Sequence, residues 1–410
     1  MTGYRDLLNY LSDFCRRIQF NFYYPVAIIL SCVIGFFYTR KPNIPIMDDY
    51  DAILNFLVKW ETNSNNRFEL LISPHNEHPL LIPKIVVLIQ YQLMGEVNFQ
   101  ILAAVSQLML IVLSFLMLWI QFNLQQRKFV TLIFLCILNF GLGTVLVWPM
   151  SGLQHISTVL ISTLTLFLFS DDLKRLPRFK WVVLYMACFT GGASLIILVI
   201  LFTTSVVLNK TVPKLLMFHA TVILFIYFKY VHAPIEPQLH FTDASLFLLH
   251  FLGNPFGKFL SPIFGLIFVI LTFFNYKKLI NRKNLFFFQI ACLNIGIGAG
   301  AALTRNSFGP AYGDEEKYFL YAVMCWLMIF SVTRDEKLKT FSLSKAIYCV
   351  LAIYIFSNSV LVKLPPIINV LKVNSVFYPQ EMRPQAIQIL EDARRLGIYN
   401  FAGVDKALPG

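Results

Sequence analysis

Three carboxylates, those of Asp48, Asp49 and Asp51, fall within four residues of one polar segment. A carboxylate in a polar segment can act as a general base. It takes the proton from a hydroxyl group while the hydroxyl oxygen attacks an activated carbon. Aspartate is also common in the first turn of a helix, where it interacts with the positive end of the helix dipole. The cluster therefore indicates either a catalytic base or the acidic start of a helix, and the spacing does not choose among the three residues.

The same polar segment continues to the sequence Ser-Pro-His-Asn-Glu-His-Pro, in which His75 and His78 flank the carboxylate of Glu77. Imidazole and carboxylate groups can hydrogen-bond sugar hydroxyls, and imidazoles can also donate to phosphate oxygens. The two histidines are three residues apart, the H-E-x-x-H order is absent, and no third ligand is visible. We therefore expect a binding role and no metal or other cofactor, without excluding a divalent ion.

Two cations, Arg305 and Lys317, flank a third polar segment, which ends at Tyr318. An arginine can hold a phosphate through two parallel hydrogen bonds, whereas a lysine acts as a point charge. The alternative is that both side chains only reach from helix ends to the membrane surface. Their expected position on the outer side, where basic residues are scarcer, favours a lipid phosphate.

Weaker signals occur in two shorter segments, Trp148–His155 and Gly253–Gly257, and turn chemistry accounts for most of both. Gln154 and His155 face either a cavity or a helix end. His219, inside an apolar stretch, is expected to contact another helix.

The elements that position these groups are expected to be membrane helices. The chain of 410 residues is 57% hydrophobic and 14% charged, so it has more apolar surface than one soluble core can bury. The net charge of +12 comes from short basic clusters between apolar windows, which indicates membrane topology and not nucleic-acid binding. The seven cysteines show no CxxC motif, and none lies in a long polar segment.

Apolar windows long enough to cross about 30 Å of hydrocarbon recur along the chain. They lie near residues 21–39, 98–121, 129–148, 153–170, 214–232, 257–276, 284–303, 317–333 and 341–362. The stretch 181–208 contains Gly191-Gly192 and is interpreted as a short hairpin. The sequence thus predicts an all-α, polytopic transmembrane bundle with about eleven spans.

The basic clusters predict a cytoplasmic N-terminus and an external C-terminus. The polar segments at 40–97, 233–256, 304–316 and beyond 363 then share the external side. Within them, residues 77–94 and 239–252 have apolar residues at helical spacing and are expected to form helices in the interface plane. We expect one transmembrane domain, 1–362, with a large first outer loop, 40–97, and a short external tail, 363–410.

With these residues in place, the chain resembles bacterial membrane glycosyltransferases of the GT-C type, particularly those that modify O-antigen. The resemblance lies in four short motifs: Asp48-Asp49-Tyr50, Asn76-Glu77-His78, Leu252 to Pro255, and an Arg-x-x-Phe-Gly run at Arg305, Phe308 and Gly309. That run usually ends in Arg-Tyr, and here it ends in Lys317-Tyr318, which keeps the charge and loses the arginine fork.

The resemblance implies an active site on the periplasmic side of the bacterial inner membrane. It implies a polyprenyl-phosphate sugar as donor, with glucose as one candidate, and a polysaccharide or lipopolysaccharide such as O-antigen as acceptor, usually without a nucleotide. Asp48 or Asp49 would be the base, with Asp51 as a further candidate for the reactive or binding group. His75, Glu77 and His78 would bind the sugar or orient the donor, and Arg305, Lys317 and Tyr318 would hold the phosphate.

Two other classes of protein use lipid-linked sugars. An O-antigen polymerase or ligase is expected to have a large, arginine-rich later loop, whereas the largest loop here is the first and is acidic. A flippase or transporter tends to place ionisable residues at mid-membrane and to show internal repeats, whereas this chain keeps nearly all its charges in loops. The sequence therefore favours a transferase.

Overall fold

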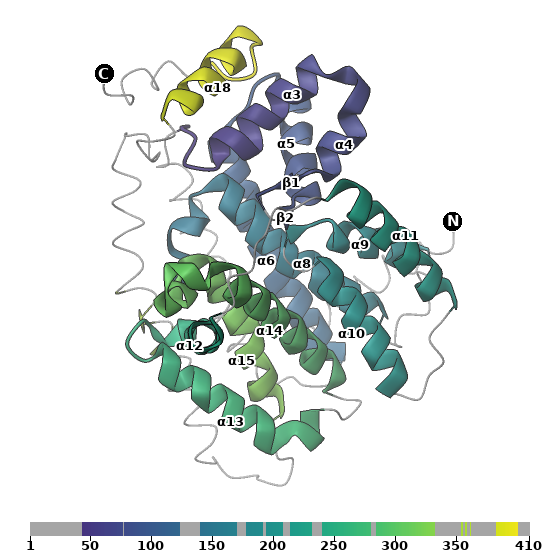
Figure 1. The fold of residues 1–410 in the computed structure, drawn as a ribbon, viewed down its shortest axis with the longest axis vertical. Coiled ribbons are helices and arrows are strands. Elements are labelled where there is room, and N and C mark those ends of the chain that lie inside the picture. Colours follow the sequence, from purple (N-terminus) through teal and green to yellow (C-terminus); the bar gives the residue numbers. More distant parts are fainter. Residues whose placement is uncertain are drawn as a thin grey trace.

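The computed structural model describes residues 43–76, 78–123, 140–169, 178–191, 194–207, 214–231, 240–279, 284–332, 354–355, 357–358, 361 and 383–400. Within these ranges the protein is all-α apart from one two-residue strand pair (Figure 1). The window expected at 21–39, most of those at 129–148 and 341–362, and Glu77 lie outside the described residues.

Four helices are long and apolar enough to cross a membrane, which indicates a multi-pass membrane protein. They are α6 (Phe99–Asn123), α8 (Pro149–Phe169), α13 (Ser261–Leu279) and α14 (Leu285–Arg305), and each matches a predicted window. Two further apolar helices, α11 (Lys214–Tyr230) and α15 (Phe319–Val332), also lie in predicted windows. The total of about eleven spans stays a prediction.

The stretch 181–208 is interrupted, as its glycine pair predicted. It forms α9 (Phe179–Cys188) and α10 (Ser194–Val207), neither of which alone is long enough to cross the hydrocarbon layer. Gly191 adopts φ +67°, and a Cβ atom at that position would collide with the Thr158 hydroxyl of α8. A glycine is therefore required where the chain turns closely against α8.

The predicted first outer loop, of which residues 43–76 and 78–97 are described, is a compact helical layer at one end of the molecule (Figure 1). It consists of a π-helical turn η1 (Tyr50–Asn55), α3 (Phe56–Thr62), the 3₁₀ turn η2 (Ser64–Asn66), α4 (Arg67–Ile72), β1 (Pro74–His75), β2 (His78–Pro79) and α5 (Leu81–Met94). Helix α5 falls in the segment predicted to be amphipathic. It buries Ile82 and Val87 against the rest of the protein and exposes Ile89 and Leu93, and its location in the interface plane stays a prediction.

A buried lysine fixes the approach to the β1–β2 turn. The Lys84 amino group donates hydrogen bonds to the carbonyl oxygens of Leu70 at 2.6 Å and Ser73 at 2.7 Å. Burial, together with the nearby charge of Lys59, lowers the pKa of Lys84 to about 7. On the far side of the turn, the Leu81 amide donates to the Phe189 carbonyl at the end of α9. The turn that carries His75 is thus held from two directions.

The predicted helix at 239–252 is observed as α12 (Phe241–Gly253), followed by the 3₁₀ turn η6 (Asn254–Phe256). The Asn254 amide donates to the carbonyl oxygens of Gly313 at 3.1 Å and Glu315 at 3.0 Å. The imidazole of His250 contacts the Asp314 carboxylate at 2.7 Å. The Leu-Gly-Asn-Pro segment therefore fixes the loop that carries Lys317.

That loop comprises three 3₁₀ turns, η7 (Asn306–Phe308), η8 (Pro310–Asp314) and η9 (Glu316–Tyr318). Burial raises the pKa of Asp314 despite its hydrogen bonds to Ser261 and His250. At η9, the Glu316 carboxylate accepts hydrogen bonds from the amide and hydroxyl of Thr144, at 2.6 and 2.9 Å. Thr144 belongs to the 3₁₀ segment η4 (Phe140–Leu146). The loop is thereby anchored through residues 313–316, directly before Lys317.

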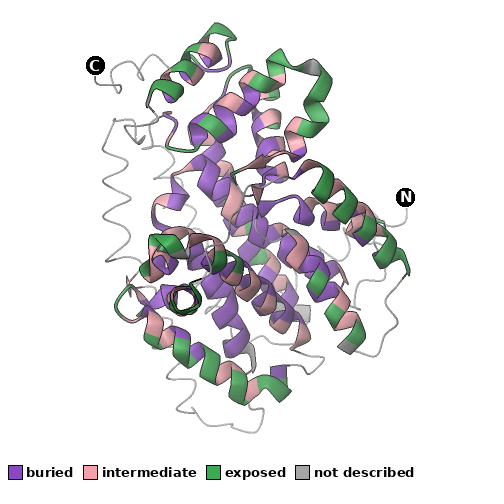
Figure 2. Ribbon diagram, viewed as in Figure 1, coloured by how far each residue is buried: buried purple, intermediate pink, exposed green. Residues whose placement is uncertain are grey.

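The described part of the C-terminal tail is not separate from the rest of the molecule. Helix α18 (Arg383–Arg395) packs against η1 and α3. The Tyr399 hydroxyl donates to the Asn43 carbonyl at 2.6 Å, and the Val97 amide donates to the Ile398 carbonyl at 2.8 Å. The described part of the tail and the first outer loop thus share a buried core at one end of the molecule (Figure 2), and their external location stays a prediction.

Candidate functional site

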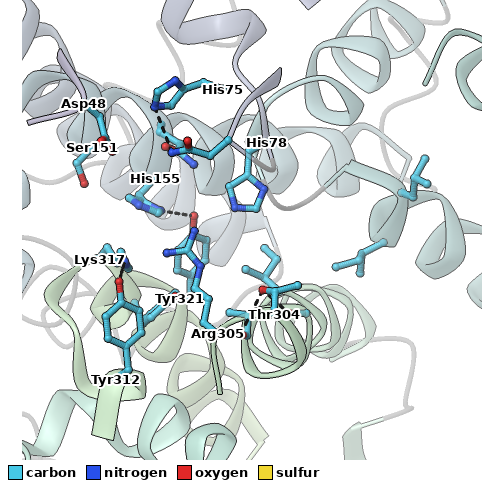
Figure 3. A pocket seen from close by; sticks show the side chains of 18 of the residues that line it. Asp48, His75, His78, Ser151, His155, Thr304, Arg305, Tyr312, Lys317 and Tyr321 are labelled. Atoms are coloured by element: carbon cyan, nitrogen blue, oxygen red, sulfur yellow. Dashed lines mark hydrogen bonds between the residues drawn. The ribbon is translucent and has the colours of Figure 1, made fainter. Parts of the chain in front are cut away.

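A cavity of about 480 Å³ lies where the first outer loop, the start of α8, the end of α14 and the 306–318 loop meet (Figure 3). Its lining combines polar groups from segments far apart in the sequence with an apolar wall. It includes six of the residues that the sequence predicted for a site: Asp48, His75, His78, Arg305, Lys317 and Tyr318. Three separate polar motifs therefore converge on one cavity.

Asp48 supplies a carboxylate to the cavity. It precedes the π-helical turn η1, it is exposed, and in Figure 3 it lies beside Ser151. Within the described ranges its carboxylate makes no hydrogen bond or ion pair. The preceding residue, Met47, has φ +46°, a left-handed conformation that is costly for a non-glycine residue. Asp48 is thus placed by a constrained backbone, with an exposed side chain at the cavity.

Asp49 points elsewhere. It is 0% exposed, and its two carboxylate oxygens accept hydrogen bonds from the backbone amides of Ile46 at 2.8 Å and Met150 at 2.9 Å. Met150 lies in the first turn of α8, where a negative charge is favourable. Asp51 accepts a hydrogen bond from Asn55 at 2.7 Å, is exposed, and does not line the cavity. Of the three aspartates, only Asp48 lines the cavity.

Replacing Asp49 by asparagine is expected to destabilise the protein. The amide side chain retains one acceptor oxygen, so one backbone amide loses its partner and faces an NH₂ group instead. A lost buried hydrogen bond of this kind costs about 1–3 kcal/mol. Thermal unfolding in detergent should show a lower melting temperature than wild type, and an unchanged melting temperature would contradict the anchoring role. Asp51→Asn is the control and should unfold as wild type does.

His75 and His78 face each other across the β1–β2 turn as a directly paired couple. Asn76, at the turn, has φ +51°, which asparagine tolerates better than most residues. Both imidazoles and Asn76 line the cavity, and the Asn76 amide nitrogen lies 3.3 Å from His75 Nε2. Glu77 lies outside the described residues. The turn therefore places two imidazoles together, as the spacing suggested.

The two predicted cations lie on the opposite wall. Arg305 is the last residue of α14 and projects into the cavity (Figure 3). The Lys317 amino group donates to the Tyr312 hydroxyl at 2.7 Å and lies 4.5 Å from the centre of the Tyr312 ring. A lysine that only extended from a helix end to the membrane surface would not need the hydrogen bond and ring contact that Tyr312 provides. Both cations thus line the cavity, where they can neutralise an anion, and Tyr312 holds Lys317 in place.

Sequence reasoning gave little weight to one pair of residues. His155 of α8 and Tyr321 of α15 both line the cavity, and His155 Nδ1 lies 2.9 Å from the Tyr321 hydroxyl. The sequence predicts that His155 faces either a cavity or a helix end, and in the structure it lines the cavity. Tyr321 lies inside an apolar window, and its only signal was its position one helical turn after Lys317.

His219 contacts another helix, as expected. Its Nδ1 lies 3.1 Å from the Tyr185 hydroxyl, and its ring stacks on Trp181 at 4.2 Å. Gln154 lines the cavity beside His155.

The remaining wall of the cavity is apolar and comes from α10, α11 and α14. It is lined by Leu195, Ile196, Tyr227, Ile297, Gly300 and Ala301. A Cβ atom added at Gly300 would meet nothing within 4 Å, so the wall is open beside this residue. The cavity thus has a polar half with cations, imidazoles and a carboxylate, and an apolar half formed by α10, α11 and α14.

Comparisons with protein families, with curated proteins and with solved structures found no match for this chain. The expectations that came from the resemblance therefore rest on the residues themselves. No group of three or more His, Cys, Asp or Glu side chains that could hold a metal ion occurs among the described residues.

The arrangement suits a reaction in which negative charge builds up on one partner and a proton leaves the other. Fixed cations stabilise a developing anion most effectively where water is largely excluded. A carboxylate across the same cavity can accept the proton. The apolar wall can hold the hydrocarbon part of an amphiphilic ligand.

Proposed function

We propose that this protein is a bacterial inner-membrane glycosyltransferase that moves a sugar from a polyprenyl-phosphate donor to a surface polysaccharide such as lipopolysaccharide O-antigen. The observation that carries the proposal is the convergence of Asp48, the His75–His78 turn and the Arg305–Lys317 pair on one cavity that also has an apolar wall. We propose that the cavity opens on the periplasmic side.

The two halves of the cavity match the two parts of the donor. Arg305 and Lys317 would bind the phosphate, the arginine through two hydrogen bonds and the lysine as a point charge. The apolar wall at Ile196, Ile297 and Gly300 would receive the first part of the polyprenyl chain. A volume of about 480 Å³ lies within the usual range for small-molecule sites and suits one sugar with its phosphate.

Asp48 would act as the general base. As the acceptor hydroxyl attacks the anomeric carbon, its proton passes to the Asp48 carboxylate, the new glycosidic bond forms, and the bond to the phosphate oxygen breaks. The electron pair leaves with the polyprenyl phosphate, whose increased negative charge is stabilised by Arg305 and Lys317. A single displacement of this kind inverts the configuration at the anomeric carbon.

His75 and His78 would hydrogen-bond the sugar hydroxyls and orient the ring. Holding donor and acceptor in line contributes a large part of the rate, since it replaces a random encounter by a fixed geometry.

The proposal is tested with the purified protein in lipid nanodiscs. Polyprenyl-phosphate donors with radiolabelled sugars, glucose first, are offered with isolated lipopolysaccharide, and nucleotide sugars are offered in parallel. We expect label in the polysaccharide only with the lipid-phosphate donor. Movement of the donor across a bilayer without transfer would support a flippase instead, and joining of whole lipid-linked oligosaccharides would support a polymerase or ligase.

A further inference from the structure

A histidine–tyrosine pair, half-buried at His155 and buried at Tyr321, lies at the cavity beside the two cations. His155 Nδ1 is 2.9 Å from the Tyr321 hydroxyl, and the rings meet edge to face with their centres 5.7 Å apart. Tyr321 is only 2% exposed and also stacks on Phe251 at 6.4 Å. In Figure 3 the pair lies between Asp48 on one side and Arg305 and Lys317 on the other. The mechanism above assigns it no role.

The His155–Tyr321 pair has two hydrogen-bond donors and uses one of them between its own members. A neutral imidazole has one N–H group, and a tyrosine has one O–H group. If the tyrosine donates to Nδ1, the imidazole N–H remains on Nε2. If Nδ1–H donates to the tyrosine oxygen, the phenol O–H remains. The first arrangement leaves the Nε2–H of His155 for a ligand in the cavity that both residues line, whereas in the second the phenol O–H is directed to Thr158, a hydrogen-bond partner of Tyr321.

We infer that His155 and Tyr321 together donate a hydrogen bond to the oxygen that links the sugar to the donor phosphate, an inference that rests on the proposed function. When the bond from the anomeric carbon breaks, its electron pair stays on this oxygen. The acceptor proton goes to Asp48, and the pair keeps its own proton. A donor aimed at an atom that gains charge binds the transition state more tightly than the bound substrate.

The test is the double variant Tyr321→Phe with His155→Leu, because either single change leaves the other residue able to donate. Transfer kinetics are measured against donor concentration in nanodiscs. We expect kcat to fall about 100-fold, as for the loss of one such donor, with the donor KM changed less than about 2-fold. This separation of kcat from KM is not expected from a general loosening of the fold.

The chain contains a matched control. Tyr185 and His219 form a second pair, with the hydroxyl 3.1 Å from Nδ1 and ring centres 5.7 Å apart, and neither residue lines the cavity. The double variant Tyr185→Phe with His219→Leu should keep the wild-type kcat. Equal losses of kcat in the two double variants would overturn the inference, because the pair would then be structural.

If the cavity double variant does not fold, Tyr321→Phe with His155→Phe replaces it, because this variant also removes both donors and keeps an aromatic ring at each position. The same criteria apply: kcat should fall about 100-fold at nearly unchanged donor KM, and the inference is overturned if kcat stays at the wild-type value. An inactive wild type counts against the proposed function. An active wild type with an unaffected cavity double variant counts against this inference alone.

Discussion

Replacing Asp48 by asparagine is expected to lower kcat for sugar transfer about 1,000-fold, within the range for the loss of a general base. Asparagine has nearly the same shape as aspartate and cannot take the acceptor proton. Because the Asp48 carboxylate makes no hydrogen bond or ion pair among the described residues, its loss should leave the melting temperature unchanged. The measurement is transfer of radiolabelled sugar at saturating donor and acceptor.

Asp51→Asn is the control for this prediction, since Asp51 belongs to the same acidic cluster and does not line the cavity. It should transfer sugar at the wild-type rate. Asp49→Asn should lose stability first and activity only through that loss. If Asp48→Asn were fully active, or if Asp51→Asn lost as much activity, the assignment of the base to Asp48 would be wrong.

Replacing Arg305 by glutamine should lower kcat/KM for the donor about 100- to 1,000-fold, the range measured when one charge-stabilising donor is removed. Arg305→Lys keeps the charge and loses the two-pronged hydrogen bond, so it should recover only part of the activity. Donor titrations with wild type and both variants measure the effect. The loss of kcat/KM in Arg305→Gln should also be larger than the loss caused by replacing an exposed cation at the protein surface.

Arg67→Gln serves as the surface control. Arg67 is an exposed cation of the first outer loop that lies 5.1 Å from the centre of the Trp60 ring, away from the cavity lining. Its replacement should change kcat/KM by less than about 2-fold. Equal effects of the two glutamine variants would mean that Arg305 acts only through the general positive charge of the outer surface.

The sequence predicted the main features of the fold because long apolar windows and amphipathic segments follow directly from the bilayer as solvent. The four long spans, α5, α12 and the break at Gly191 all lie where the pattern placed them. The attachment of α18 to the first outer loop was not predictable, since it depends on contacts such as that of Tyr399 with Asn43. No local pattern encodes such a long-range hydrogen bond.

The candidate site also has residues that the sequence predicted and residues that only the structure identified. Residue types identified Asp48, His75, His78, Arg305 and Lys317, because charged and imidazole groups are scarce in so apolar a chain. Choosing between Asp48 and Asp49 needed the structure, since neighbouring residues on a tight turn point in different directions. Tyr321 was missed because a tyrosine within an apolar window looks like any other core residue until its hydroxyl is seen against His155.

The most direct test of the central claim, that this cavity holds a polyprenyl-phosphate sugar, is to map where the donor binds. A polyprenyl-phosphate sugar with a photoreactive group on the sugar is bound to the wild-type protein in nanodiscs, irradiated, and located by mass spectrometry of the digested chain. The account predicts labelling within the His75–His78 turn and residues 305–321, suppressed by excess unlabelled donor and in Arg305→Gln. Labelling confined to the exposed face of α13, or labelling that unlabelled donor does not suppress, would contradict it.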